Sequence, residues 1–144
     1  MPVLTLAPDN RDNLHAALSD STWCVACLCA AWCDVCSNFR DSFTALADLH
    51  PTMQFVWIDI EDEADLVGDI DVENFPTLLI QQGSRVAFFG TVQPAIKAIQ
   101  RLIQAQVRHA GDTGAGASGA SGATRAPIDS LDLRARLAAH PTRP

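Results

Sequence analysis

Apolar residues occur along this chain in short continuous runs that favour buried β-strands. Two of these runs are apolar on both faces, as the central strands of parallel sheets are. A turn at Gln82-Gly83 separates the last two runs, which predicts an antiparallel hairpin. The predicted strands cover residues 3–6, 22–29, 53–58, 77–80 and 85–89.

Between and after these runs, apolar residues recur every three or four positions, as they do on one face of an α-helix. The longest predicted helix ends at His50, because the residue before a proline resists the helical region. The last helix carries Pro94 in its first turn and a core stripe centred on Ile99 and Ile103. The predicted helices run from a cap at Asp9 or Asn10 to about Asp20, from Cys33 to His50, from Glu61 to Gly68 and from Thr91 to His109.

The order of these elements, β-α-β-α-β-α-β-β-α, predicts an α/β fold. Its central mixed sheet is mostly parallel, has helices on both faces and gains antiparallel pairing from the terminal hairpin. Residues 1–110 are expected to form this domain, followed by a flexible Gly/Ala/Ser linker at 111–126 and a C-terminal tail at 127–144. The tail has a pattern for a short helix, which docks on its own domain or on a partner. A disordered, solubilising tail is the alternative.

Composition and charge narrow the classes of partner. The chain has 144 residues, of which 48% are hydrophobic, and a formal net charge of −7 at pH 7. Binding to nucleic acid is not expected, because phosphate contacts need a basic face. Residues 1–8 lack the basic and apolar regions of a secretory signal, and no apolar run approaches the roughly 20 residues of a membrane span. We therefore expect a cytoplasmic protein that binds neither nucleic acid nor a membrane.

Cys33 and Cys36 stand where a buried strand gives way to a helix. The first turn of a helix carries unsatisfied N–H groups and about half a positive charge, which stabilise a thiolate. Because residues three apart share one helix face, Cys33 can attack a disulfide and Cys36 can resolve the mixed disulfide. The pair therefore predicts thiol–disulfide exchange.

The remaining cysteines and the acidic residues receive simpler interpretations. A structural zinc ion needs four ligands, and the four histidines show no ligand spacing, so no metal site is expected. Cys24, Cys27 and Cys29 are interpreted as buried small hydrophobes of the preceding strand. Cys27 and Cys29 share one face of that strand, and Cys27 is expected near Cys36. The eight carboxylates of residues 59–73 are interpreted as a solvated face that steers basic partners.

A proline at the entry to the fourth strand adds a second signal. If the bond before Pro76 is cis, the backbone of Phe75 stays free to pair with an extended peptide. Together with the order of the elements, this proline makes residues 1–110 resemble the thioredoxin family. The resemblance is carried by Ala31-Trp32-Cys33-Asp34-Val35-Cys36, by Asn74-Phe75-Pro76-Thr77-Leu78, and by Gly83 and Gly90.

The resemblance implies a role for each matching residue. It makes Cys33 the exposed attacking thiol and Cys36 the buried resolving thiol, with no cofactor beyond this dithiol. It makes Pro76 the cis-proline that faces the disulfide and makes Phe75 the residue that pairs with the substrate backbone. The substrate-binding residues that it implies are Trp32, Phe75, Pro76 and Gly90.

Two departures from the family pattern bear on the chemistry. The family usually has Gly-Pro between its cysteines, whereas this chain has Asp34-Val35. Asp34 places a negative charge beside Cys33, so we expect it to raise the pKa of that thiol and to make the dithiol more reducing. The family's buried aspartate aligns with Cys27 and its lysine partner approximately with Trp57, so both members of that charged pair are absent.

The sequence thus predicts a thioredoxin-like protein-disulfide reductase. Its expected partners are protein disulfides and an unidentified reductase. One alternative is a redox-inactive module of the same fold that binds partners through the groove at Pro76 or through the tail. Another is the delivery of a metal ion or an iron–sulfur cluster held by Cys33 and Cys36 across a dimer.

Overall fold

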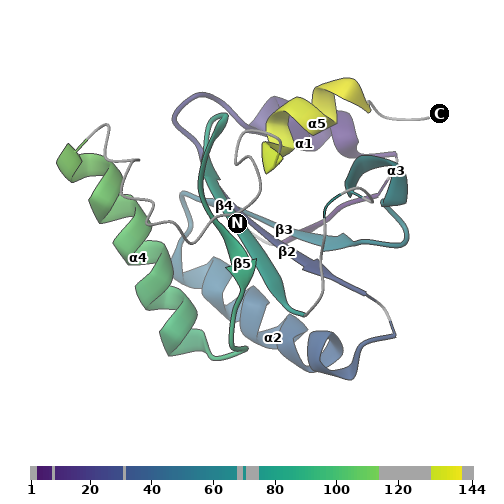
Figure 1. The fold of residues 1–144 in the computed structure, drawn as a ribbon, viewed down its shortest axis with the longest axis horizontal. Helices are drawn as coiled ribbons and strands as arrows, with labels where there is room; N and C mark the ends of the chain where they lie inside the picture. Colours follow the sequence, from purple (N-terminus) through teal and green to yellow (C-terminus); the bar gives the residue numbers. More distant parts are fainter. Residues whose placement is uncertain are drawn as a thin grey trace.

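The computed structural model describes residues 3–7, 9–30, 32–67, 70, 75–113 and 131–140. A five-stranded mixed sheet runs through its centre (Figure 1). The sheet has the order β1-β3-β2-β4-β5, in which β1, β3 and β2 are parallel and β4 and β5 are antiparallel. The strands are β1 Leu4–Thr5, β2 Trp23–Cys29, β3 Gln54–Asp59, β4 Thr77–Gln82 and β5 Arg85–Thr91.

Helices cover both faces of this sheet, as the sequence predicted. In Figure 1, α2 lies below the sheet and α4 to its left, whereas α1 and α5 lie above the sheet and α3 to its right. The helices are α1 Arg11–Ala17, α2 Asp34–Leu49, α3 Ala64–Val67, α4 Ile96–Thr113 and α5 Leu133–Ala139. The prediction of an α/β fold with a mixed sheet and helices on both faces is confirmed.

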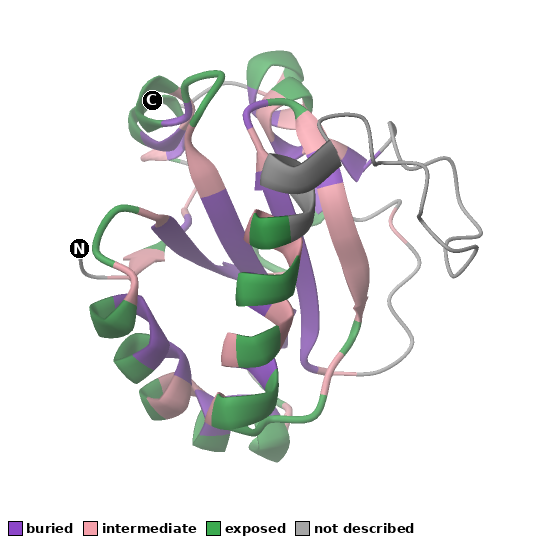
Figure 2. Cartoon of the chain, turned by 90° about the vertical axis from the view of Figure 1, so that its left-hand side faces the viewer, coloured by how far each residue is buried: buried purple, intermediate pink, exposed green. Residues whose placement is uncertain are grey.

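Side chains of the central strand β2 alternate between two hydrophobic cores, because successive residues of a strand point to opposite faces. Cys24, Ala26 and Leu28 enter the core under α1, α3 and α5. Cys27 and Cys29 enter the core under α2 and α4, which also contains Cys36. Figure 2 shows the resulting pattern, with the strands buried and the outer faces of the helices exposed. The strand therefore delivers two of its cysteines to the start of α2.

The bounds of the last hairpin and of the last helix differ from the prediction. The helix expected from Thr91 begins at Ile96, because Thr91 still pairs in β5 and the N–H of Val92 donates to the carbonyl of Pro76. Pro94 therefore precedes the helix rather than lying in its first turn. The turn of the last hairpin lies at Gly83-Ser84, since Gln82 still pairs with Arg85. Gly83 has a φ of +58°, a conformation that glycine adopts without strain.

The helix expected from Glu61 is also shorter and later. Among its described residues only Ala64–Val67 is helical, and Gly68 lies outside the described residues. The N–H groups of Glu61 and Asp62 both donate to Oδ1 of Asp59, at 2.8 and 3.1 Å. This carboxylate holds the preceding residues in a turn instead of a helix.

The tail forms the predicted short helix and docks on its own domain. Leu131, Leu133 and Leu137 are buried in the core under α1 and α3. The fully buried side chain of Gln81 in β4 accepts from the N–H of Leu133 at 2.8 Å and donates to Asp132 Oδ1 at 2.9 Å. Of the linker expected at 111–126, residues 111–113 belong to α4 and the others lie outside the described residues.

The acidic residues of 59–73 do not all form the solvated face that was expected. Glu63 is fully buried and forms an ion pair of 2.8 Å with the equally buried Arg11. The same guanidinium holds Asp65 at 2.8 Å and donates to the carbonyl of His140 at 3.4 Å. Arg11 therefore joins α1 to α3 and to the end of α5. Asp69, Asp71 and Glu73 lie outside the described residues.

Candidate active site

Cys33 lies between the end of β2 and the first turn of α2. It is the N-cap residue of α2, with an extended backbone at φ −91° and ψ 117°. Its N–H donates to the carbonyl of Ala30 at 3.0 Å, and its carbonyl accepts from the N–H of Ser37 at 3.1 Å. The side chain is half-buried and its thiol is free. A side chain at this position lies next to the unpaired N–H groups of the first helical turn, which favour a negative charge.

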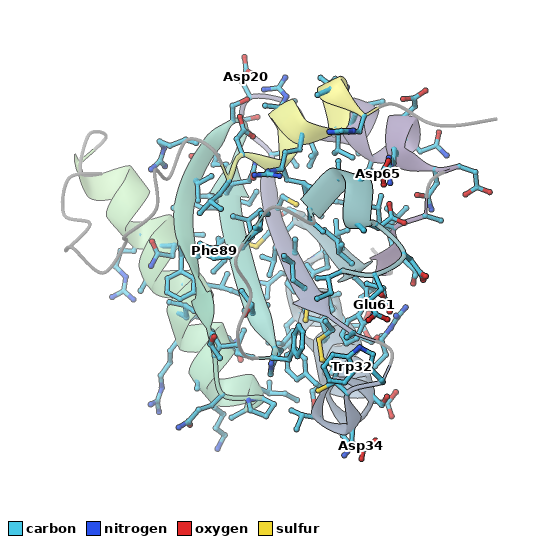
Figure 3. All side chains as sticks on the ribbon, turned by 45° about the vertical axis from the view of Figure 1, so that its right-hand side comes forward. Asp20, Trp32, Asp34, Glu61, Asp65 and Phe89 are labelled. Atoms are coloured by element: carbon cyan, nitrogen blue, oxygen red, sulfur yellow. A yellow bond between two sulfur atoms is a disulfide. The ribbon has the colours of Figure 1, made fainter. Side chains whose placement is uncertain are left out.

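An aromatic pair lies beside this cysteine. Trp32 is 64% exposed, and its ring packs edge-on against Phe75 with centroids 5.6 Å apart. Nε1 of Trp32 donates to Oε2 of Glu61 at 3.0 Å, and Figure 3 shows the two labelled side chains next to each other. Pro76 is buried directly after Phe75, and the bond between these two residues is cis. The structure thus brings Trp32, Phe75 and Pro76 to the same end of the sheet as Cys33.

Gly90 lies in β5, and the register of the hairpin puts it opposite Leu78. A Cβ at this position would approach Cζ of Phe88 to 3.3 Å, so a larger residue would require the phenyl ring to move. The expected place of Gly90 in a substrate rim with Trp32 stays a prediction.

Cys36 is bonded to Cys29 in this structure. The two Cα atoms lie 5.8 Å apart, within the usual range for a disulfide. Both residues are 1% exposed, whereas Cys33 is half-buried. The interpretation of Cys29 as a plain buried hydrophobe is therefore wrong. Cys29 and Cys36 belong to the same core under α2, which brings them within disulfide distance of each other. The roles of Cys33 and Cys36 in catalysis stay predictions.

Cys27 lies next to this disulfide, as expected. Its Sγ is 3.5 Å from Sγ of Cys29, and burial raises the pKa of its thiol against the opposing charge of Arg40. Because a disulfide sulfur has no proton, Cys27 is the donor in this contact. The guanidinium of Arg40 lies 4.7 Å above the ring of Trp57, which pairs with Cys27 across β2 and β3. The position where the family carries a buried aspartate therefore holds a protonated thiol.

The remaining cysteine lies apart from these sulfurs. Cys24 is 1% exposed in the core on the opposite face of the sheet, and burial raises the pKa of its thiol to about 12. It is an unreactive buried thiol at neutral pH, as was expected.

Carboxylates surround the exposed side of the site. Asp34 is exposed as the first residue of α2, and Glu61, which accepts from Trp32, is exposed beside that ring (Figure 3). The influence of Asp34 on Cys33 stays a prediction. Within the described part of the chain, no group of three or more His, Cys, Asp or Glu side chains is arranged to hold a metal ion. In the same part of the chain, no helix has the length and apolar character needed to cross a membrane.

Fold and site together define an α/β protein with a cysteine pair at a strand-to-helix junction and a cis-proline at the entry to β4. The family model for thioredoxin matches residues 5–105. The chain therefore belongs to the thioredoxin family.

Individual relatives agree with this assignment. Thioredoxin of Mus musculus is 30% identical over 61 residues, which are 42% of this chain and 58% of the relative. Putative thioredoxin 2 of Streptomyces coelicolor is 25% identical over 79 residues, which are 55% of this chain and 58% of the relative. The matched region thus spans a little over half the length of these two relatives.

Solved structures extend the agreement in fold over more of the chain. Thioredoxin f from spinach chloroplast has a TM-score of 0.61 at 19% identity, over 74% of this chain and 94% of its own. A thioredoxin from Nicotiana alata has a TM-score of 0.63 at 20% identity, over 73% of this chain and 92% of its own. At these identities the likeness shows a common fold. Family membership and the neighbouring cysteines support thiol–disulfide chemistry in general terms.

Proposed function

We propose that this protein is a thiol–disulfide oxidoreductase that reduces protein disulfides, with Cys33 as the attacking thiol and Cys36 as the resolving thiol. The observation that carries the proposal is the position of Cys33. It is a free, half-buried thiol at the N-cap of α2, beside the exposed ring of Trp32. Cys36 is buried in the first turn of the same helix, as a resolving thiol requires.

The reaction needs only these two thiols. The Cys33 thiolate attacks one sulfur of the substrate disulfide, forms a mixed disulfide and releases the other substrate sulfur as a thiolate. Cys36 then loses its proton and attacks Sγ of Cys33, which releases the second substrate thiolate and closes a Cys33–Cys36 disulfide. Two electrons have passed to the substrate, whose thiolates take up protons. A separate reductase must return the two electrons.

The substrate would bind along the aromatic pair. We propose that the backbone of Phe75 pairs with the substrate and that the turn at Pro76 exposes this backbone. Trp32 and Gly90 would make apolar contacts with the substrate. The carboxylates around the site favour substrates with basic residues near their disulfide. For recycling, a protein of the same fold provides a precedent: thioredoxin f2 has been solved in a complex with ferredoxin:thioredoxin reductase. A cytoplasmic location remains part of the proposal.

The test is reduction of a protein disulfide such as that of insulin, with dithiothreitol as the electron source. Wild-type protein should accelerate the reaction, and Cys33→Ser should return it to the rate with dithiothreitol alone. Cys36→Ser should accumulate a mixed disulfide with the substrate, because the resolving thiol is missing. Cys24→Ser is the matched control and should keep full activity, since Cys24 lies on the opposite face of the sheet. Wild-type protein without activity would overturn the proposal.

One observation favours a second candidate, a redox-inactive binding module. Cys36 is bonded to Cys29, and Cys33 is left without a resolving partner in this form. A module of this kind would bind partners through the apolar surface at Trp32 and Phe75 without chemistry. Capture of a partner that survives Cys33→Ser, together with inactivity towards insulin, would favour this candidate.

A further inference from the structure

Four of the five cysteines form a series from the half-buried Cys33 to the buried Cys36, Cys29 and Cys27. Cys33 is the half-buried member at the N-cap of α2. Cys36 follows in the first helical turn, and Cys29 is bonded to it from β2. Cys27 contacts Cys29 at 3.5 Å. Cys36 is therefore the branch point of the series, with one potential partner on its exposed side and one on its buried side.

We propose that Cys29 is a third catalytic thiol, which displaces Cys33 from its disulfide with Cys36 by internal thiol–disulfide exchange. The proposal rests on the function proposed above and extends it by one step. The disulfide received from the substrate moves from the surface into the core, and Cys33 becomes a free thiol again while the protein stays oxidised.

The exchange balances without an added oxidant or reductant. In the net reaction the proton of Cys29 passes to Cys33: Cys29 is deprotonated, and its thiolate attacks Sγ of Cys36 in the Cys33–Cys36 disulfide. The Cys29–Cys36 bond forms, the bond between Cys36 and Cys33 breaks, and the electron pair leaves on Sγ of Cys33. Cys33 is then a thiolate at the helix N-terminus, or a thiol once it takes up a proton. The number of disulfides in the protein is unchanged.

The surroundings of Cys33 favour exchange from the Cys33–Cys36 disulfide to the Cys29–Cys36 disulfide. The sulfur released from the disulfide is that of Cys33, next to the N–H groups of the first turn of α2, which stabilise a leaving thiolate. At the buried end, the thiol of Cys27 donates a hydrogen bond to Sγ of Cys29. In the reverse reaction Cys29 leaves as a thiolate, and the same contact stabilises it there. Cys27 is thus a positioning residue for the exchange.

The exchange has a consequence for substrates. A thioredoxin with two active-site thiols has no nucleophile once they are joined. With the disulfide held by Cys29 and Cys36, this protein still presents the thiol of Cys33 beside Trp32 and Phe75. It can therefore attack a second protein disulfide before any reductase has acted. Cys36 is then occupied, so the mixed disulfide persists and the substrate can rearrange its own pairing.

Chymotryptic mapping of the full-length oxidised protein distinguishes the two pairings. Cleavage after Trp23, Trp32 and Phe39 separates peptide 24–32 from peptide 33–39. A Cys33–Cys36 bond stays within peptide 33–39, whereas a Cys29–Cys36 bond joins the two peptides. Cleavage after Leu28 assigns the joined sulfur to Cys29.

The reduced protein is oxidised with one equivalent of diamide, quenched in acid at successive times and alkylated before digestion. We expect the bond within peptide 33–39 to appear first and the bond between the peptides to replace it. Native oxidised protein should then react with one equivalent of iodoacetamide at Cys33. A bond that stays within peptide 33–39, with Cys33 protected from alkylation, would overturn the exchange.

Variants separate the exchange from the reductase function. Cys29→Ala should hold the disulfide within peptide 33–39 and lose the alkylation of Cys33 in the oxidised protein. Cys24→Ala is the matched control and should behave as wild type. Cys27→Ala should keep the final pairing but reach it at a different rate. If wild-type protein forms the joined peptides but does not reduce insulin, the reductase function fails and the exchange stands. If wild-type protein reduces insulin without ever forming the joined peptides, the exchange fails and the reductase function stands.

Discussion

Each cysteine of this chain takes its chemistry from the face of the element that carries it. The two-residue period of β2 sends Cys24 to one core and sends Cys27 and Cys29 to the other. The N-cap position gives Cys33 exposure, and the first turn of α2 buries Cys36. The same residue type therefore packs in the core at one position and is a partly exposed free thiol at another.

The surroundings of His50 lead to a prediction about how the stability of the folded state depends on pH. Its ring stacks on Phe55 with centroids 6.0 Å apart, and Nε2 is buried without a hydrogen-bond partner. Burial lowers the pKa of His50 in the folded state below its ordinary value of about 6.5. As the pH falls below about 6.5, the unfolded chain takes up the proton first, so this group makes the folded state progressively less stable.

The measurement is urea unfolding of wild-type protein and His50→Phe at pH 7.5 and pH 5.5. The phenylalanine keeps the stacked ring and cannot titrate, so the variant should lose less stability between the two pH values than wild type does. Equal losses for the two proteins would contradict the assigned cause.

Part of the site could be predicted from the sequence, for a physical reason. Spacing alone places Cys33 and Cys36 on one helix face and Cys27 and Cys29 on one strand face. The pairing of Cys29 with Cys36 depends on how far α2 is shifted along β2 where the two pack together. Local patterns carry no information about that shift, so the pairing of Cys29 with Cys36 was missed.

At the scale of elements, short-range patterns placed the central elements well and the peripheral ones less well. β2 and α2 lie within a residue or so of their expected bounds, because long apolar runs and Pro51 define them. The start of α4 was missed because Val92 bonds to Pro76, a contact between residues distant in sequence. The burial of Glu63 was missed for the same reason, since its partner Arg11 belongs to another helix.

The ion pair between α1 and α3 makes the first prediction at this scale. Arg11 and Glu63 are both fully buried, so removing one partner leaves an uncompensated charge in the core. Arg11→Met should lower the free energy of unfolding by about 3–5 kcal/mol. The double variant Arg11→Met/Glu63→Leu should recover most of this loss, because a buried apolar pair needs no counter-charge. Chemical denaturation of the four members of the cycle measures both effects, and an additive double variant would contradict the coupling.

The contact between β4 and α5 leads to the second prediction at the scale of elements. Gln81 is the buried side chain that receives the N–H of Leu133. Gln81→Leu leaves this donor unpaired, which should cost about 1–3 kcal/mol and loosen α5. Trypsin should then cleave the native protein after Arg134 and Arg136 faster than it cleaves wild type. Gln82→Leu is the matched control, since the side chain of this neighbouring glutamine contacts Ser21 and Arg85, at 3.4 and 3.3 Å, and not α5. Equal cleavage rates for the two variants would exclude the anchoring role of Gln81.

For the whole molecule, α5 completes a core that α1 and α3 cover only in part. α1 has 7 residues and α3 has 4, and Leu131, Leu133 and Leu137 fill the space beside them. In Figure 1, α5 lies over α1 at the top of the molecule. The thioredoxin fold of this chain therefore includes a segment beyond the residues that match the family.

Deletion of residues 131–144 tests this conclusion. Burial of a leucine contributes about 1.5–3 kcal/mol, so loss of three approaches the total stability of a small domain, about 5–15 kcal/mol. The shortened protein should melt at a much lower temperature and bind the dye ANS through its exposed core. A peptide of residues 131–140 should suppress the dye signal, and the same peptide with Leu133→Ser and Leu137→Ser should not. A shortened protein that melts like wild type would refute the contribution of α5.

The position of α5 in the chain also has a consequence for synthesis on the ribosome. The sheet and the helices α1 to α4 end at Thr113, but the apolar face beneath α5 stays open until Leu137 has been made. At elongation rates of about 5–20 residues per second, the intervening 24 positions take roughly 1–5 s. During that interval the nascent chain exposes a leucine-lined surface of the kind that chaperones bind. Because α5 is synthesised last, the apolar surface beneath it is buried, and protected from aggregation, only at the end of synthesis.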